Sequence, residues 1–168
     1  RVVSEVALRV RQSLVIEDVL DTAVVEIKQF LNCDRAIVYQ FAADWSGKVV
    51  SEAVDPQWRV SLGAEIIDTC FQETKAQLYQ DGRQRVIPDI YQASLSECHT
   101  RLLVEFQVRA VLVVPLLLNP DDPAKQPRLW GLLICHQCQA PREWTNGATL
   151  FLDQLGVQLS IAIYQAEL

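Results

Sequence analysis

The sequence predicts an α+β fold, in which an antiparallel β-sheet is flanked by helices and a long helix lies at each end of the chain. Apolar residues recur at helical spacing near both ends of the 168 residues. Between them, β-branched and aromatic runs form pairs that are separated by turn residues. Because 50% of the residues are hydrophobic, the chain can bury one sizeable core, and we expect one domain over residues 1–168.

The first half of the chain predicts one helix and one hairpin. Apolar spacing from Leu14 to Leu31 indicates a helix packed on a core, with Ser13 available as its N-cap. DRAIVYQFA (34–42) and GKVVSEAV (47–54) have strand composition, and the Gly and Ser of ADWSG suit the turn between them. We therefore expect two antiparallel strands after the first helix.

The second half predicts a helix, two strands and a terminal helix. The helix is expected from about Ser94 to Phe106, and the strands over 108–118 and 128–138, joined by a Pro- and Asp-rich loop. The terminal helix is expected from Thr145 to Glu167. Its apolar residues recur at heptad-like spacing at Leu152, Leu155, Leu159, Ala162 and Ala166. This stripe favours helix pairing between two chains, and packing under the sheet of a monomer is the alternative.

Composition excludes several classes of partner and compartment. The formal net charge is −6 and no basic block occurs, so nucleic-acid binding is disfavoured. The five cysteines are not spaced like a secreted disulfide framework, which favours a reducing compartment and predicts a cytoplasmic location. No apolar run approaches the length of a membrane span, and a start on Arg1 leads us to expect a piece of a longer protein.

The segment SLSECHTRLLVEFQ places Cys98 beside His99 at the polar end of the predicted helix. A thiol in that position can reach a cleft, so Cys98 is a candidate attachment residue. The alternative is an ordinary half-buried cysteine beside a surface histidine. A catalytic dyad is disfavoured, because adjacent side chains on a helix diverge by about 100°.

The segment EIIDTCFQE places Asp68 two residues before Cys70. In an extended segment, this spacing directs the carboxylate and the thiol to the same side. Asp68 could alternatively cap a short helix that starts near Cys70.

The segment LWGLLICHQCQAPREW has strand composition. Strict alternation places Trp130, Leu132, Ile134, His136 and Cys138 on one face, and Leu133 and Cys135 on the other. His136 is therefore a candidate pocket residue. A zinc or redox role for Cys135-x-x-Cys138 is less favoured, because no second cysteine pair stands at finger spacing.

Together, these three segments resemble the bilin-binding GAF domains of cyanobacteriochromes, photoreceptors distantly related to phytochromes. DIYQASLSECHTRLLVEFQVRAVLVVPLL is similar to that family's chromophore-attachment helix and the strands that follow it. DTCF, residues 68–71, resembles the Asp-x-Cys-Phe motif of the two-cysteine subfamily. The resemblance implies a light-sensing domain that is not an enzyme apart from loading its own chromophore.

The resemblance also implies a cofactor and a role for each motif. The cofactor would be a linear tetrapyrrole, either phycocyanobilin or its isomer phycoviolobilin. Cys98 would form the permanent thioether, His99 would pack against the pyrroles, and Asp68 would accept hydrogen bonds from pyrrole N–H groups. Cys70 would form a reversible second bond that shortens the conjugated system and moves absorption to the violet or blue.

Other pocket residues are assigned from their positions near these segments. Propionate groups need cations, and Arg83, Arg85 and Arg101 are near the pocket segments, with Arg83 and Arg101 preferred. Each of them could equally be a solvated surface charge. Tyr91 and His136 are expected at one end or on the floor of the pocket, with core packing as the alternative for Tyr91. Cys135 departs from the family pattern and is expected in the core.

Two other functions are possible on the same scaffold. A thiol-dependent reductase would cycle its cysteines through a disulfide and would be colourless. A GAF domain that binds cyclic nucleotide or only dimerises would have no assigned role for Cys98, His99 or DTCF. For the photoreceptor, we expect a signalling output domain as partner and a homodimer formed through the terminal helices of the full-length protein.

Overall fold

The predicted α+β fold class is confirmed by the computed structural model. The structure describes the backbone at residues 2–66, 76–119, 122 and 124–167, and side chains from residue 15 onward. The elements follow in the order α1 (Val2–Leu31), β1 (Arg35–Phe41), β2 (Gly47–Val54), β3 (Glu65–Ile66), α3 (Gln77–Gln80), β4 (Arg85–Ile87), α4 (Glu97–Glu105), β5 (Ala110–Leu118), β6 (Arg128–Gln137) and α5 (Asn146–Glu167).

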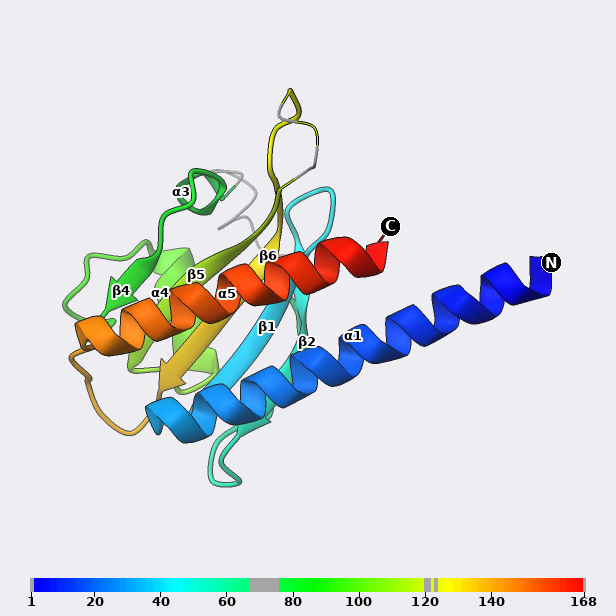
Figure 1. Cartoon of the computed structure of the whole chain (residues 1–168). Coiled ribbons are helices and arrows are strands. Elements are labelled where there is room, and N and C mark those ends of the chain that lie inside the picture. The colour runs from blue at the N-terminus through cyan, green and yellow to red at the C-terminus, as the bar shows by residue number, and fades with distance from the viewer. Residues whose placement is uncertain (1, 67–75, 120–121, 123, 168) are drawn as a thin grey trace.

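A six-stranded antiparallel sheet forms the middle layer, with strand order β3-β2-β1-β6-β5-β4. Helices α1 and α5 pack side by side on one face, and α4 lies on the other (Figure 1). The central strands β1, β6 and β5 are buried almost throughout, because helices cover both of their faces. This explains why their sequences are continuous apolar runs.

The predicted hairpin is confirmed in both its strands and its turn. Strands β1 and β2 pair from Arg35 opposite Val54 to Phe41 opposite Gly47. At the turn, the Asp44 carboxylate accepts a hydrogen bond of 3.0 Å from the backbone N–H of Ser46 and another from its hydroxyl. Asp in this position closes the turn through its own side chain.

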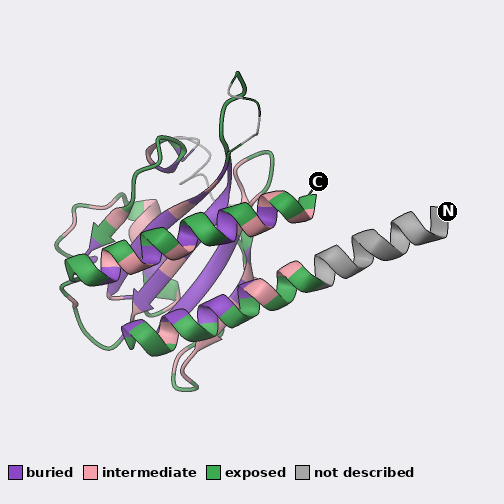
Figure 2. Ribbon diagram, viewed as in Figure 1, coloured by how far each residue is buried: buried purple, intermediate pink, exposed green. Residues whose placement is uncertain are grey.

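Two buried clusters lie on opposite faces of the sheet, and Figure 2 shows the central strands coloured as buried. The larger cluster joins the sheet to α1 and α5, and includes Val24, Ile27, Leu112 and Leu152. The smaller cluster joins the other face to α3 and α4, through Tyr79 and Leu103 among others. The smaller cluster is the one next to the predicted attachment helix.

Strand β6 corrects the alternation that was predicted for it. Trp130 packs in the larger cluster and not on the face of Leu132 and Ile134, which belong to the smaller cluster. The cause is a β-bulge: Leu116 pairs with Gly131 while Leu117 pairs with Leu129, which leaves Trp130 as the extra residue. Because a bulge inserts one extra residue, side chains before it lie on the face opposite to the one that strict alternation predicts. The prediction for Trp130 was therefore wrong, and that for Leu132 and Ile134 holds.

The heptad-like stripe of the terminal helix faces the sheet. Leu152 and Leu159 are 0% and 3% exposed, and Leu155 packs against the same cluster. A different stripe of α5, formed by Leu150, Val157 and Ile161, is half-exposed to solvent. Across the described chain, no helix combines the length and apolarity needed to cross a membrane.

Candidate functional site

A cavity lies between α4 and the sheet, and its empty space, counted out into the open mouth, is about 630 Å³. Its apolar walls come from Ile37, Val49, Ile66, Leu102, Leu103, Phe106, Val108, Val111, Val113, Leu132 and Ile134. Its described polar groups are those of Tyr39, Ser61, Tyr79, His99 and His136. Burial raises the pKa of Tyr39, and it raises the pKa of Tyr79 to about 12, so both phenols stay neutral. A ligand that fits these walls is largely apolar and carries a few polar groups.

The first turn of α4 brings His99 to this cavity, with Cys98 beside it in the helix. Ser96 is the N-cap, and its hydroxyl oxygen accepts a hydrogen bond of 3.2 Å from the backbone N–H of His99. The helix therefore begins at Glu97, three residues after the predicted start near Ser94, and both residues lie in its first turn. His99 lines the cavity. Cys98 is half-buried and lies one helical turn before Leu102, a residue of the cavity wall.

His99 is neutral at physiological pH. Burial of the imidazole, followed by the positive charge of Arg85, lowers its pKa to about 4. It therefore contacts the cavity as a weakly polar aromatic ring. This placement agrees with the predicted packing role, which itself stays a prediction.

His136 lies on the opposite wall and is held by a buried arginine. The side chain is 6% exposed, and its Nδ1 is 3.2 Å from Nη1 of Arg35. Burial, then the charge of Arg35 and the neighbouring His99, lowers the pKa of His136 well below its ordinary value. The two imidazoles thus line one cavity in neutral form.

Arg35 is 0% exposed and joins three segments behind the cavity. Nη1 donates to the carbonyl oxygen of Phe106 at 3.0 Å, at the end of α4. Nη2 donates to the carbonyl oxygen of Arg59 at 2.5 Å, in the loop between β2 and β3. Cys138 completes the surroundings, with its Sγ 3.6 Å from Nη1.

Glu52 balances this buried charge. Its Oε2 lies 3.3 Å from Nε of Arg35, in a side chain that is only 3% exposed. The contact is an ion pair without hydrogen-bond alignment at Nε. Glu52 also accepts hydrogen bonds from the backbone N–H groups of Ser61 and Leu62, at 2.9 and 3.2 Å. The pair therefore ties the loop that carries Ser61 to the cavity wall.

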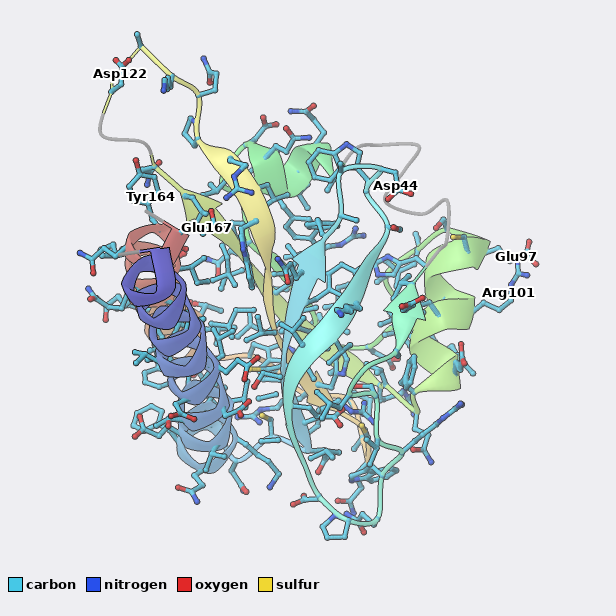
Figure 3. All side chains as sticks on the ribbon, turned by 90° about the vertical axis from the view of Figure 1, so that its right-hand side faces the viewer. Asp44, Glu97, Arg101, Asp122, Tyr164 and Glu167 are labelled. Atoms are coloured by element: carbon cyan, nitrogen blue, oxygen red, sulfur yellow. The ribbon has the colours of Figure 1, made fainter. Side chains whose placement is uncertain are left out.

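The three candidate arginines occupy different positions. Arg101 is 75% exposed and pairs with Glu97 at 3.6 Å, and both side chains project from α4 into solvent (Figure 3). Arg83 is exposed and is not among the described lining residues. Arg85, the less favoured candidate, is half-buried and close enough to lower the pKa of His99. A propionate role for any of them stays a prediction, and the geometry favours Arg85.

Tyr91 differs from the expectation that it lines the pocket. Its ring is 61% exposed and lies 5.2 Å from the guanidinium of Arg109. Arg109 is held in turn by Asp89, which accepts its Nε and Nη2 hydrogens at 3.0 and 3.1 Å. The described cavity wall does not include Tyr91. The physical reason is the cation–π contact, which holds the ring on the surface.

Asp68 and Cys70 lie outside the described residues, so their predicted roles stay predictions. Cys135 is 0% exposed within the larger cluster, as predicted for a core residue. In the described part of the chain, no group of three or more His, Cys, Asp or Glu side chains could hold a metal ion.

Sequence reasoning missed Arg35 and Glu52. The available signal was a charged residue of opposite sign in each of two neighbouring strands, Arg35 at the start of β1 and Glu52 near the end of β2. A buried charge requires a buried partner, so the two residues predict each other once the strands are paired.

The chain belongs to the GAF domain family, because the family model described as "GAF domain" matches residues 15–163. Among curated relatives, a predicted methyl-accepting chemotaxis protein of Synechocystis sp. is 37% identical over 100% of this chain and 16% of its own length. The circadian input-output histidine kinase CikA of Thermosynechococcus vestitus is 35% identical over 100% of this chain and 23% of its own length. The chain therefore spans less than a quarter of either relative.

Solved structures of photoreceptor GAF domains superpose on this fold. The blue-light-absorbing form of the Thermosynechococcus elongatus PixJ GAF domain has a TM-score of 0.82 and 34% identity, covering 93% of this chain and 89% of its own. The red-light-absorbing state of NpR6012g4, a red/green cyanobacteriochrome, has a TM-score of 0.79 and 34% identity, covering 90% and 96%. The far-red-absorbing dark state of JSC1_58120g3, with bound biliverdin, has a TM-score of 0.82 and 27% identity, covering 100% of both chains.

Proposed function

We propose that this GAF domain is a light-sensing module that binds a linear tetrapyrrole covalently at Cys98. The observation that carries the proposal is the apolar cavity, which has two neutral imidazoles facing inward and the half-buried side chain of Cys98 next to His99 in the first turn of α4. Similarity to cyanobacteriochrome structures, one of them in a blue-light-absorbing form, supports the same function.

The cavity residues fit such a group on physical grounds. Aliphatic walls suit a planar conjugated system, and the neutral rings of His99 and His136 can contact it without burying a second cation beside Arg35. The bilin, when bound, supplies light absorption and double-bond isomerisation. The protein supplies the anchor, the packing and the hydrogen bonds. Phycocyanobilin or phycoviolobilin is the proposed chemical species, on the family resemblance.

The proposed residue roles divide between the two sides of the cavity. Cys98 adds its thiolate to the bilin, without a separate enzyme, and so fixes the bilin permanently to α4. Asp68 provides the carboxylate that balances a protonated pyrrole system. Cys70 forms the reversible second bond that distinguishes a violet- or blue-absorbing state from a longer-wavelength state.

Production of the protein together with phycocyanobilin tests this proposal. We expect a coloured protein whose absorption spectrum changes reversibly under blue light. After acid denaturation, the pigment should remain on the polypeptide and fluoresce with zinc on a gel. The Cys98→Ala variant should lose the covalent pigment, whereas Cys138→Ala, which removes a buried free thiol, should keep it.

Two results would contradict the assignment. A protein that stays colourless with every supplied bilin would favour the reductase or nucleotide-binding alternatives. Covalent pigment on Cys98→Ala, combined with loss on Cys70→Ala, would show that the two cysteines have exchanged roles.

We further propose that the domain passes its signal to an output domain through a homodimer. Support comes from the relatives, which are parts of longer proteins that include a histidine kinase, and from the half-exposed stripe of Leu150, Val157 and Ile161 on α5. We expect a weak, concentration-dependent dimer for residues 1–168 and a firm one for the full-length protein. Sedimentation of the full-length protein in both photostates tests this, and a strict monomer throughout would remove the dimer mechanism.

A further inference from the structure

We propose that Arg35 is a positioning residue that holds the His136 imidazole in its Nε2–H tautomer, so that the cavity offers a ligand a neutral N–H donor. The claim about the ligand, that Nε2–H binds it, rests on the proposed function, because it takes the bound molecule to carry a neutral hydrogen-bond acceptor. The claim about the tautomer of His136 concerns the protein alone.

The first step is the donor chemistry of the contact. A guanidinium has only N–H donors and does not lose its proton in proteins. Nδ1 of His136, at 3.2 Å from Nη1 of Arg35, must therefore accept the hydrogen bond. An accepting Nδ1 carries no proton, so in the neutral ring the proton resides on Nε2.

The second step is that Arg35 cannot move aside. It is fully buried and anchored by the carbonyl oxygens of Phe106 and Arg59 and by the carboxylate of Glu52. These three partners come from α4, from the loop after β2 and from β2 itself. A guanidinium fixed from three directions presents Nη1 to the histidine in one orientation.

The third step excludes the doubly protonated ring. The charged or titratable groups that act on His136 are the guanidinium of Arg35 and the imidazole of His99 across the cavity, and the thiol of Cys138 contacts the same Nη1 of Arg35. Of the two buried carboxylates nearby, that of Glu52 is already paired with Arg35, and that of Asp34 accepts the backbone N–H groups of Cys138 and Gln139. No described anion is therefore left for an imidazolium, and burial beside a cation keeps the ring neutral.

The consequence concerns what the cavity can recognise. His136 lines an otherwise mostly aliphatic wall, and its described hydrogen bond is the one to Arg35 through Nδ1. Nε2–H is thus a hydrogen-bond donor that β6 offers to the cavity, besides the hydroxyl groups of Tyr39, Ser61 and Tyr79. A neutral oxygen or nitrogen acceptor satisfies it, whereas a cation or a ligand N–H does not.

NMR of the apoprotein tests the tautomer without any pigment. The chain has two histidines, so a His99→Gln variant leaves His136 as the one imidazole in a long-range ¹⁵N–¹H spectrum. We expect one protonated and one unprotonated ring nitrogen, with Nε2 carrying the proton, unchanged between pH 7.5 and 5.5. A ring protonated on Nδ1, or an averaged pair of nitrogens, would overturn the inference.

A variant pair isolates the role of Arg35. Arg35→Met alone would strand the Glu52 carboxylate, so the test uses Arg35→Met/Glu52→Gln, with Glu52→Gln alone as the matched control. We expect mixed tautomers and a raised pKa of His136 in the double variant, and the Nε2–H form in the control. If the folded double variant keeps the pure Nε2–H form, Arg35 does not position the ring.

Recognition of the ligand through Nε2–H of His136 is tested on pigment-loaded protein. We expect the Nε2 proton of His136 to shift downfield and to exchange with water at least tenfold more slowly than in the apoprotein. An unchanged proton would overturn recognition through Nε2–H. Failure of the proposed function is a separate result, because it appears as a colourless protein while the tautomer is still measurable.

Discussion

The two neutral imidazoles make the apoprotein's stability depend on pH, and this dependence can be worked out from the structure. An unfolded histidine titrates near pH 6.5, whereas burial lowers the folded pKa of His99 to about 4 and that of His136 well below the ordinary value. As the pH falls below 6.5, the unfolded chain therefore takes up protons that the folded chain does not. The free energy of unfolding decreases in this range, and His99 stops contributing below its folded pKa.

The expected magnitude follows from the size of the pKa difference. At pH 5, a histidine that is neutral in the folded state and unperturbed in the unfolded state lowers the free energy of unfolding by about 2 kcal/mol. His136 is almost fully buried and should approach this value. His99 is only half-buried, so solvent screening makes its share smaller. Together they should remove about 3 kcal/mol between pH 7 and pH 5, a large part of a typical domain's stability.

Urea unfolding followed by tryptophan fluorescence at pH 7, 6 and 5 measures this loss. The matched control is His99→Gln/His136→Gln, which lacks both titrating groups but shares every carboxylate. We expect the wild-type protein to lose stability steadily below pH 6.5, and the double variant to change by less than about 0.5 kcal/mol, close to the extrapolation error. Equal losses in both proteins, or a flat wild-type profile, would refute the assignment of neutral buried imidazoles.

Three further substitutions test individual contacts. In Gly131→Ala the new methyl group would lie 2.1 Å from the backbone oxygen of Tyr39, so we expect a loss of about 3 kcal/mol or more in urea unfolding. Gly147→Ala on α5, whose methyl group would meet only the Thr145 hydroxyl oxygen at an ordinary 3.8 Å, should be neutral or slightly stabilising. Asp34→Ala removes the carboxylate that accepts two backbone N–H groups at the end of β6, at 2.7 and 3.1 Å, and should cost about 3 kcal/mol by the same assay. Asp68→Asn should change the pigment's spectrum or photoconversion while the apoprotein's stability stays within about 1 kcal/mol; an unchanged spectrum with a large stability loss would favour a helix cap.

Patterns local in sequence predicted the secondary structure well. The hairpin of β1 and β2, the pair β5 and β6 and both terminal helices agree with the predicted ranges to within a few residues, except that α1 begins at Val2. These elements follow from periodicity and turn chemistry, which neighbouring residues determine. The start of α4 differs from the prediction because Ser96 caps the helix, which places its first residue at Glu97 and not near Ser94.

Which face of a strand or helix a side chain lies on depended on contacts with other elements, and the local sequence pattern does not specify those contacts. Trp130 changed face because a bulge absorbed one residue against β5. Leu152 and Leu159 turned toward the sheet although their spacing also suited a helix pair. In both cases the same sequence pattern was compatible with two environments, and packing against a neighbouring element selected one.

The sequence by itself determined the fold class, the family resemblance and the cysteine–histidine pair on α4, because each depends on residues close together in the chain. Only the tertiary structure decided which charges serve the cavity. Arg35 meets His136 across 101 positions and Phe106 across 71, and Arg85 approaches His99 while Arg101, two residues from His99 in sequence, points to solvent. Charges act through distance in space and through desolvation, and a linear sequence encodes neither quantity directly.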